Sequence, residues 1–148
     1  MDIICFPGTP DSLGEIRSFI RNAMEQARVD KKRIYHLQLA VDEIASNIVI
    51  YGYKDGLIRG DIEVEIVEDP TRIVVTLKDT SPAFDPLRVK MPDNSDLQQP
   101  LEDRSIGGLG IYLAIKNVDE FRYMYADGKN HNMFILNNTK VDLKDHGD

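Results

Sequence analysis

A carboxylate and an amide stand four residues apart in one predicted helix of this 148-residue chain: Glu43 and Asn47. Residues at i and i+4 project from the same side of a helix, so a glutamate base and a neutral oxygen ligand could hold a water molecule and a hard divalent cation. Such pairs also occur by chance in many helices, where the two side chains have a structural role or are simply exposed to solvent. The neighbouring Leu39, Ala40 and Ile50 favour a function, because a carboxylate beside apolar side chains loses hydration energy.

Asp79 ends an alternating apolar segment and opens the stretch Thr80-Ser81-Pro82-Ala83-Phe84-Asp85-Pro86. An aspartate at a strand end most often closes a turn by accepting hydrogen bonds from its own backbone. The alternative is an acceptor for the exocyclic amino group of a nucleobase at the bottom of a pocket. The residues alone leave both interpretations open.

A glycine turn, Gly107-Gly108-Leu109-Gly110, directly precedes a predicted helix. Glycines allow close backbone approach, and the amides at a helix start favour phosphate oxygens. The alternative is a tight turn that only packs one helix against another. The turn lacks both the Gly-Lys-Ser/Thr of a P-loop and the spacing of a dinucleotide fold. Arg104 lies on the incoming loop, where it could approach phosphates or remain solvated.

The elements that must position these residues follow from hydrophobic periodicity. We expect a strand at 2–6, followed by a helix that starts at Asp11 or Ser12. A second helix should run from about Lys31 to Tyr51 and be covered on two sides. A hairpin with strands at 62–66 and 73–77 should follow. Residues 80–105 lose all periodicity, and 87–105 are expected to be a mobile lid. A helix and a closing hairpin, 121–125 with 133–136 across a loop at 127–130, follow before a frayed tail at 138–148. Segregated strands and helices predict one α+β domain over residues 1–148, a two-layer sandwich with one helical layer.

The composition narrows the classes of function. A formal net charge of −7 makes nucleic acid an unfavourable main partner, whereas a small anion can still bind locally. The single cysteine, Cys5, excludes an intrachain disulfide and a multi-thiolate metal site, and its apolar neighbours predict a buried thiol. The three histidines show no metal-ligand spacing. Without a membrane-spanning apolar stretch or a leader-like start, the chain is expected to be cytoplasmic and away from membranes.

The three motifs stand in one order along the chain: Glu43-x-x-x-Asn47 on a helix, Asp79-x-Ser81-x-x-Phe84-Asp85-Pro86 after a strand, and the glycine turn before a helix. In this order they resemble the N, G1 and G2 boxes of the GHKL ATPase superfamily, the Bergerat fold. Within it, residues 37–47 and 118–130 are similar to the stand-alone anti-sigma-factor serine/threonine kinases. The resemblance covers about residues 3–137.

This resemblance implies an α/β sandwich with a mixed, mostly antiparallel sheet that binds ATP and Mg²⁺ between helices and sheet. Glu43 then matches the general base, Asn47 the Mg²⁺ ligand and Asp79 the acceptor for the adenine amino group. The remaining nucleotide-binding positions are Ser81, Phe84, Arg104, Gly108, Leu109 and Gly110. Ser81 departs from the family pattern, which usually has glycine there, so a reduced affinity for ATP is expected.

The resemblance also implies a function. The chain would be a protein serine kinase and anti-sigma factor that phosphorylates a serine of a small STAS-type antagonist, while another face binds a sigma factor. A homodimer is implied as well. The alternative is a non-catalytic binding module that sequesters a regulatory partner, with nucleotide only fixing the lid or playing no part.

Overall fold

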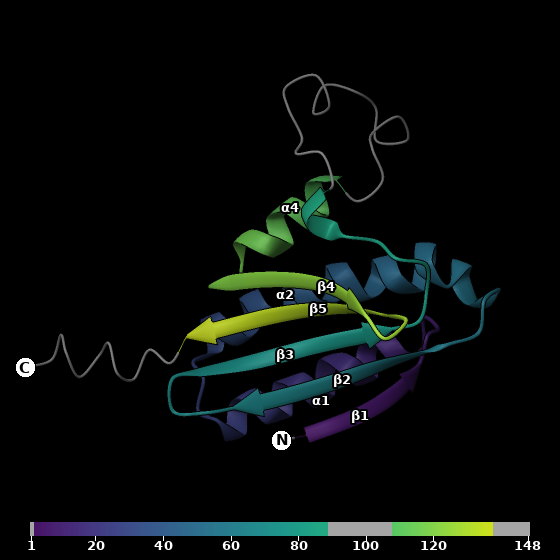
Figure 1. Cartoon of the computed structure of the whole chain (residues 1–148). Helices are drawn as coiled ribbons and strands as arrows, with labels where there is room; N and C mark the ends of the chain where they lie inside the picture. The colour runs from purple at the N-terminus through teal and green to yellow at the C-terminus, as the bar shows by residue number, and fades with distance from the viewer. Residues whose placement is uncertain (1, 89–107, 138–148) are drawn as a thin grey trace, which may run out of the picture.

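A computed structural model describes residues 2–88 and 108–137, and Figure 1 shows the arrangement of their helices and strands. In chain order the elements are β1 (Asp2–Pro7), α1 (Ser12–Gln26), α2 (Lys31–Asn47), the π-helix η1 (Ile48–Gly52), the short 3₁₀ helix η2 (Lys54–Gly56), β2 (Asp61–Glu68), β3 (Arg72–Asp79), the 3₁₀ turn η3 (Pro86–Arg88), α4 (Gly108–Lys116), β4 (Glu120–Ala126) and β5 (Lys129–Asn137). The expected lid beyond Arg88 and the expected tail at 138–148 lie outside the described residues.

The five strands form one sheet in the order β1-β2-β3-β5-β4, with each neighbouring pair antiparallel. Helices α1 and α2 lie behind this sheet in Figure 1, on one of its faces. The predicted two-layer α+β architecture is therefore confirmed. The described strands are all antiparallel, whereas the resemblance implied a mixed sheet.

The core lies between the two layers and follows the predicted spacing of apolar residues. Helix α1 buries Ile16, Ile20 and Met24, and α2 buries residues from Ile34 to Ile44 at helical spacing. They pack against inward-facing strand residues that include Ile62, Val64, Val75, Leu77 and Phe134. Each fully buried aliphatic side chain contributes about 1.5–3 kcal/mol to stability. This packing fixes α2 against the sheet.

Helix α2 does not continue as an α-helix to Tyr51. It ends at Asn47, and the next turn widens into η1, in which the backbone amide of Tyr53 donates to the carbonyl of Ile48 over 2.8 Å. The expectation of apolar cover on two sides is only partly met, because Ala40 is fully buried whereas Leu39 and Ile50 are each 41% exposed. Short π-helical turns often lie at functional sites.

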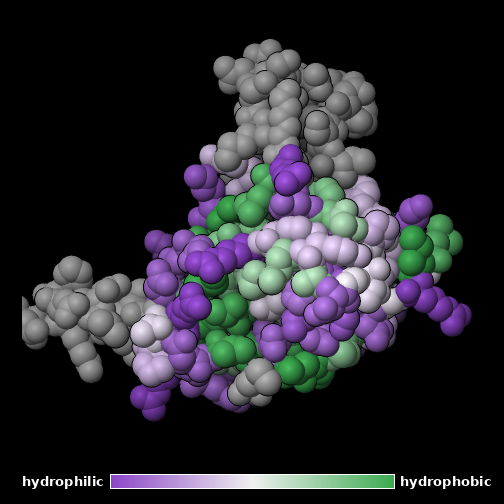
Figure 2. All heavy atoms as spheres, in the orientation of Figure 1, coloured by the Kyte–Doolittle hydropathy of each residue, from purple (hydrophilic) through white to green (hydrophobic). Residues whose placement is uncertain are grey.

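Cys5 is exposed, so the prediction of a buried thiol is wrong. Strand β1 is an edge strand in which successive side chains point to opposite faces. Phe6 faces the helices opposite Ile62, whereas Cys5 lies opposite Glu63 on the outer face. Figure 2 shows that this outer face carries hydrophilic side chains among hydrophobic ones. The apolar residues around Cys5 therefore predicted burial on both faces of β1, whereas only the face toward the helices is buried at Phe6.

The closing hairpin is tighter than the sequence suggested. Lys129 and Asn130 already belong to β5, so that only Asp127 and Gly128 form the connection. Both have positive φ values, 56° and 74°. Two-residue loops of this conformation match the twist of antiparallel strands, and Asp-Gly is a favoured sequence for them. The expected four-residue loop was wrong, and the shift brings Asn130 into the sheet.

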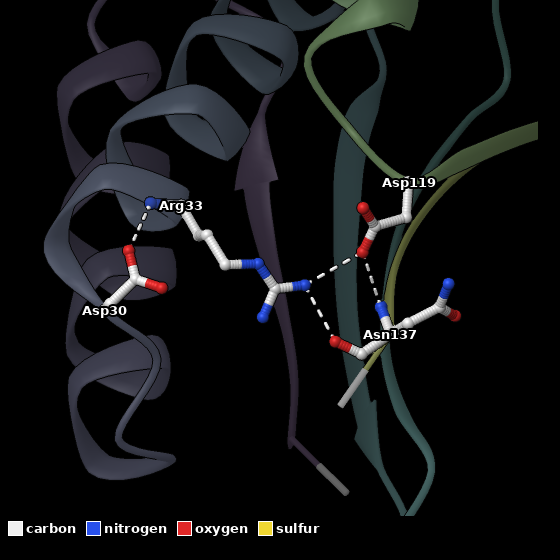
Figure 3. A network of polar contacts seen from close by, with 4 residues as sticks. All are labelled: Asp30, Arg33, Asp119 and Asn137. Carbon is white, nitrogen blue, oxygen red and sulfur yellow. Dashed lines mark hydrogen bonds and ion pairs between the residues drawn. The ribbon is translucent and has the colours of Figure 1, made fainter. Parts of the chain in front are cut away.

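A polar network joins the start of α2 to the ends of two strands (Figure 3). Asp30 caps α2 by accepting from the backbone amide of Arg33 over 3.0 Å. The Arg33 guanidinium donates to Asp119 over 2.8 Å and to the carbonyl of Asn137 over 2.7 Å. Asp119 also accepts from the backbone amide of Asn137. The network anchors the connection between α4 and β4 to α2.

Candidate functional site

A cavity of about 350 Å³ opens between the C-terminal part of α2, the segment after β3, α4 and the start of β5. Most of its lining is apolar. Its polar residues are Asn47, Asp79, Ser81, Asn130 and Asn132. An apolar pocket with a few convergent polar groups is the usual form of a small-molecule site.

Asp79 is 1% exposed, and its two carboxylate oxygens have different surroundings. Oδ1 accepts hydrogen bonds from the Ser81 amide over 3.0 Å, from the Ser81 hydroxyl and from the Asn130 side chain over 3.0 Å. Oδ2 is buried and has no hydrogen-bond partner among the described residues. Burial raises the pKa of the Asp79 carboxyl, while the bonds from Ser81 and Asn130 oppose that rise.

This geometry unites the two interpretations that the sequence left open for Asp79. Oδ1 closes the turn onto Ser81, and Oδ2 remains a buried acceptor without a partner among the described residues, on a side chain that belongs to the lining of the cavity. A buried polar atom without a partner calls for an explanation, and a ligand that supplies a donor would provide one. The exocyclic amino group of adenine is such a donor, so the residues present fit the expected base.

Ser81, the departure from the family pattern, is accommodated by Gly52 of η1. A Cβ atom built on Gly52 would lie 2.6 Å from the Ser81 hydroxyl oxygen and 2.9 Å from its Cβ. The Ser81 side chain therefore occupies space that a side chain at position 52 would need. Its hydroxyl is bonded to Asp79, and its effect on nucleotide affinity stays a prediction.

Tyr53, which the sequence reasoning did not single out, fixes the strand end beside Asp79. It is fully buried between two glycines, since a Cβ on Gly8 or Gly60 would lie 2.3 or 2.4 Å from its ring. Its hydroxyl donates to the carbonyl of Asp61 over 2.7 Å and accepts from the amide of Thr80 over 2.9 Å. Burial raises the pKa of this hydroxyl. Two glycines flanking one aromatic ring could not be paired from the sequence.

Asn130 is the second residue that sequence reasoning missed. It lies directly opposite Asp79 in the β3–β5 register, is 2% exposed and bonds to the segment that follows β3. A signal was present in the sequence: the inward-facing positions of β5 read Asn130, Asn132, Phe134 and Leu136, so two amides occupy places in an otherwise apolar row. Asn132 Oδ1 is likewise buried without a partner in the described part of the chain.

Glu43 and Asn47 are neighbours on α2, as the spacing predicted. The Asn47 side-chain amide donates to Glu43 Oε2 over 3.3 Å. With that nitrogen engaged, the amide oxygen is the atom of Asn47 that a hard cation would bind. Within residues 2–88 and 108–137, no group of three or more His, Cys, Asp or Glu side chains could hold a metal ion.

The first turn of α4 packs against the carboxylate of Glu43. A Cβ built on Gly110 would lie 2.5–2.6 Å from the three atoms of the Glu43 carboxyl group. Only glycine at this position permits the approach. The glycine turn therefore has the packing role that the sequence offered as one alternative, and a phosphate-binding role stays a prediction.

The predicted site residues thus divide into three groups. Asn47, Asp79, Ser81 and Phe84 line one cavity, with Phe84 half exposed. Glu43 and Gly110 meet beside it, and Gly108 and Leu109 begin α4. Arg104 lies outside the described residues. In the part of the chain that the structure describes, no helix has the length and apolar character to cross a membrane.

Comparison with known proteins places these features in a family. Residues 6–135 match the family described as histidine kinase-like ATPase domain. The serine-protein kinase RsbW of Bacillus cereus strain AH187 is 30% identical over 95 residues, which are 64% of this chain and 59% of that protein. The chain therefore spans about three fifths of the length of this relative. RsbW of Bacillus licheniformis is 26% identical over 139 residues, covering 92% of this chain and 86% of the relative.

A solved structure shares the fold. A chain of the SiaB–SiaC complex from Pseudomonas aeruginosa superimposes with a TM-score of 0.51 at 16% identity, covering 91% of this chain and 89% of the other. The match to the ATPase domain begins at residue 6, near the end of β1, and ends at residue 135, inside β5, so it includes all of β2, β3 and β4. The RsbW relatives agree with the resemblance to serine kinases. The chain belongs to the histidine kinase-like ATPase domain family, within the GHKL superfamily.

Proposed function

We propose that this chain is an ATP-dependent protein serine kinase that acts as an anti-sigma factor. Its acceptor is a serine of a small STAS-type antagonist, another face sequesters a sigma factor, and it works in the cytoplasm as a homodimer. The observation that carries the proposal is the buried Oδ2 of Asp79, which has no hydrogen-bond partner among residues 2–88 and 108–137, on a residue that lines the same cavity as Asn47. The similarity to proteins named serine-protein kinase supports the type of reaction.

Each proposed role uses a group whose surroundings suit it. Asp79 Oδ2 accepts from the adenine amino group, and the apolar walls of the cavity hold the base. The Asn47 amide oxygen ligates Mg²⁺, which usually binds with few protein ligands together with substrate phosphates and water. The amides of Gly108 and Gly110, at the N-terminus of α4, favour phosphate oxygens. Ser81, Phe84, Leu109 and Arg104 complete the proposed set.

The reaction needs one base and a correct alignment. Bound Mg²⁺ neutralises charge on the transferring phosphoryl group. Glu43 takes the proton of the acceptor serine hydroxyl as the serine oxygen bonds to the γ-phosphorus, and the bond from that phosphorus to the bridging oxygen breaks to leave ADP. The hydrogen bond from Asn47 holds Oε2 of Glu43, which fixes the base beside the metal ligand.

The replacement of Glu43 by glutamine tests this role. Glu43→Gln keeps the volume and the acceptor for the Asn47 amide but removes the proton acceptor, so single-turnover transfer from labelled ATP to the antagonist should fall about 10²-fold or more. Affinity for Mg-ATP should change little, because the base acts in the transition state. The measurements are phosphorylation of the purified partner and calorimetric binding of Mg-ATP.

Glu25→Gln provides a matched control, because Glu25 is an exposed glutamate near the end of α1. Its transfer rate should equal that of the wild type. An unchanged rate in Glu43→Gln would remove Glu43 from the mechanism. A wild-type protein that binds its partner without any phosphate transfer would instead support the alternative, a non-catalytic module that sequesters a regulatory partner.

A further inference from the structure

The side-chain amide of Asn130 makes several hydrogen bonds to the end of β3 and to the segment that follows it. Its side-chain nitrogen donates to Asp79 Oδ1 over 3.0 Å, to the carbonyl of Ser81 over 3.0 Å and to that of Pro82 over 3.3 Å. Its side-chain oxygen accepts from the amide of Phe84 over 3.0 Å and from the Tyr123 hydroxyl. The amide of this one β5 residue is therefore bonded to β4, through Tyr123, and to four residues that line the cavity.

We propose that Asn130 is a positioning residue for base recognition: its amide occupies Asp79 Oδ1, holds the segment 81–84, and thereby leaves Oδ2 as the oxygen presented to the base. This inference rests on the proposed binding of adenine nucleotide, and it adds the residue that sets the selectivity of that binding. Asn130 itself bonds only to protein groups in the contacts above, so its action on the base passes through Asp79.

The geometry of the sheet supports this assignment. Asp79 and Asn130 are direct partners across the antiparallel β3–β5 pair, so their side chains lie on the same face, the face toward the helices. The tight Asp127–Gly128 turn sets this register, because it places Asn130 as the second residue of β5. The side chain is also 2% exposed, so water does not compete for its hydrogen bonds.

The chemistry of the amide supports it as well. A donor held against Oδ1 favours the carboxylate form of Asp79, the form whose Oδ2 can accept from an amino group. Burial acts in the opposite direction and raises the pKa of Asp79. The other groups that act on this carboxyl are Ser81, which donates to it, and His131, whose charge lowers its pKa. The hydroxyls of Tyr53 and Tyr123 stay neutral, because burial raises their pKa values.

The decisive measurement is the ratio of affinities for ATP and for inosine triphosphate, whose base has an oxygen in place of the 6-amino group. A site built around an acceptor for that amino group should prefer ATP by about 10²-fold or more. In Asn130→Ala the ratio should fall about tenfold, because Oδ1 loses one of its donors and keeps only those of Ser81, which lets the Asp79 carboxylate turn. If the role of Asn130 were purely structural, Asn130→Ala would lower the affinities for both nucleotides equally and leave their ratio unchanged.

A second substitution tests the donor NH₂ of the Asn130 amide separately from its acceptor oxygen. Asn130→Asp keeps an acceptor for the Phe84 amide but places a second carboxyl beside Asp79, which disfavours its charged form. ATP affinity is lost as the pH falls through the pKa of Asp79, because the protonated acid no longer offers the acceptor. The midpoint of that loss should therefore move to higher pH in Asn130→Asp than in the wild type, with Asn130→Ala between them.

Asn22→Ala, an exposed asparagine on α1, is the control and should keep the wild-type ratio and pH profile. If Asn130→Ala does not fold, Tyr123→Phe decides, since it removes only the hydroxyl bonded to Asn130 and should lower the ratio in the same direction. A wild-type ratio in the folded variant overturns this inference and leaves the proposed function standing. A wild-type protein that does not distinguish the two nucleotides overturns the adenine assignment and this inference together.

Discussion

The two carboxylate oxygens of Asp79, a residue that lines the cavity, have different surroundings, and the burial of this carboxyl affects the stability of the fold. Oδ1 has donors from Ser81 and Asn130, whereas Oδ2 is buried without a partner in the described residues. Burial raises the pKa of this carboxyl, so the folded protein binds a proton more tightly than the unfolded chain. Above that raised pKa the charged carboxylate therefore lowers the stability of the fold.

Asp79→Asn should for this reason separate binding from stability. Asparagine keeps an oxygen for the donors of Ser81 and Asn130, removes the buried charge, and places an NH₂ donor where Oδ2 stood. We expect a melting temperature equal to or above that of the wild type together with a loss of ATP affinity of about 10²-fold or more. Thermal unfolding and calorimetry provide the two readings.

The control for this substitution is Asp69→Asn, in the turn between β2 and β3. The Asp69 carboxylate accepts from the amides of Thr71 and Arg72, and these bonds hold its pKa below the ordinary value. ATP affinity should be unchanged there. If Asp79→Asn binds ATP as the wild type does, Oδ2 is not the acceptor of the base.

Among the elements, the approach of α4 to α2 depends on one missing side chain. Gly110→Ala would place a methyl group 2.5–2.6 Å from the Glu43 carboxyl group, the flexible end of its side chain. Because alanine favours a helix by about 1 kcal/mol over glycine, we expect the fold to persist and Glu43 to move. Single-turnover transfer should fall at least tenfold, while the melting temperature stays within about 3 °C of the wild type.

Gly14→Ala is the matched control in α1, where an added Cβ meets nothing within 4 Å. That change should raise stability by about 1 kcal/mol and leave transfer unaltered. Equal transfer rates in both variants would show that the contact between Gly110 and Glu43 does not hold the base in place.

Most elements could be predicted because each has a hydrophobic period of its own. The spacing from Ile34 to Ile44 defines α2, and the alternation at 62–66 and 73–77 defines the central hairpin. The widening of the helix into η1 could not be predicted in this way. It depends on a hydrogen bond from the Tyr53 amide to the Ile48 carbonyl and on the space that Gly52 leaves for Ser81. The spacing of apolar residues in the sequence specifies neither contact.

The candidate site was predictable where motif residues lie close in sequence, and less so where the sheet brings distant residues together. Asp79 and Ser81 are two residues apart, and the turn between them follows from the chemistry of aspartate. Asn130 is 51 residues from Asp79 and meets it only through the β3–β5 register. A hairpin loop assigned two residues too long was enough to leave Asn130 in a turn.

The net charge of the whole molecule affects how a nucleotide reaches the cavity. With 18 basic and 25 acidic residues, the chain repels an anion at distances beyond its local contacts. Salt screens that repulsion, so the association rate of Mg-ATP should rise, by roughly twofold, between low and physiological ionic strength. Stopped-flow binding of Mg-ATP and of uncharged adenosine gives the comparison, because adenosine should show no such dependence. A rate for Mg-ATP that falls with salt would point to a local cationic patch that dominates the approach.

The exposed thiol of Cys5 makes one face of this molecule open to chemical labelling. It is the single cysteine of the sequence, and it lies on the outer face of the sheet, whereas Asp79 and Asn130 point to the helix side. A thiol-reactive dye would therefore attach at one defined position, on the other side of the sheet from the cavity. The unaltered protein thus carries a reporter for whatever covers its outer face.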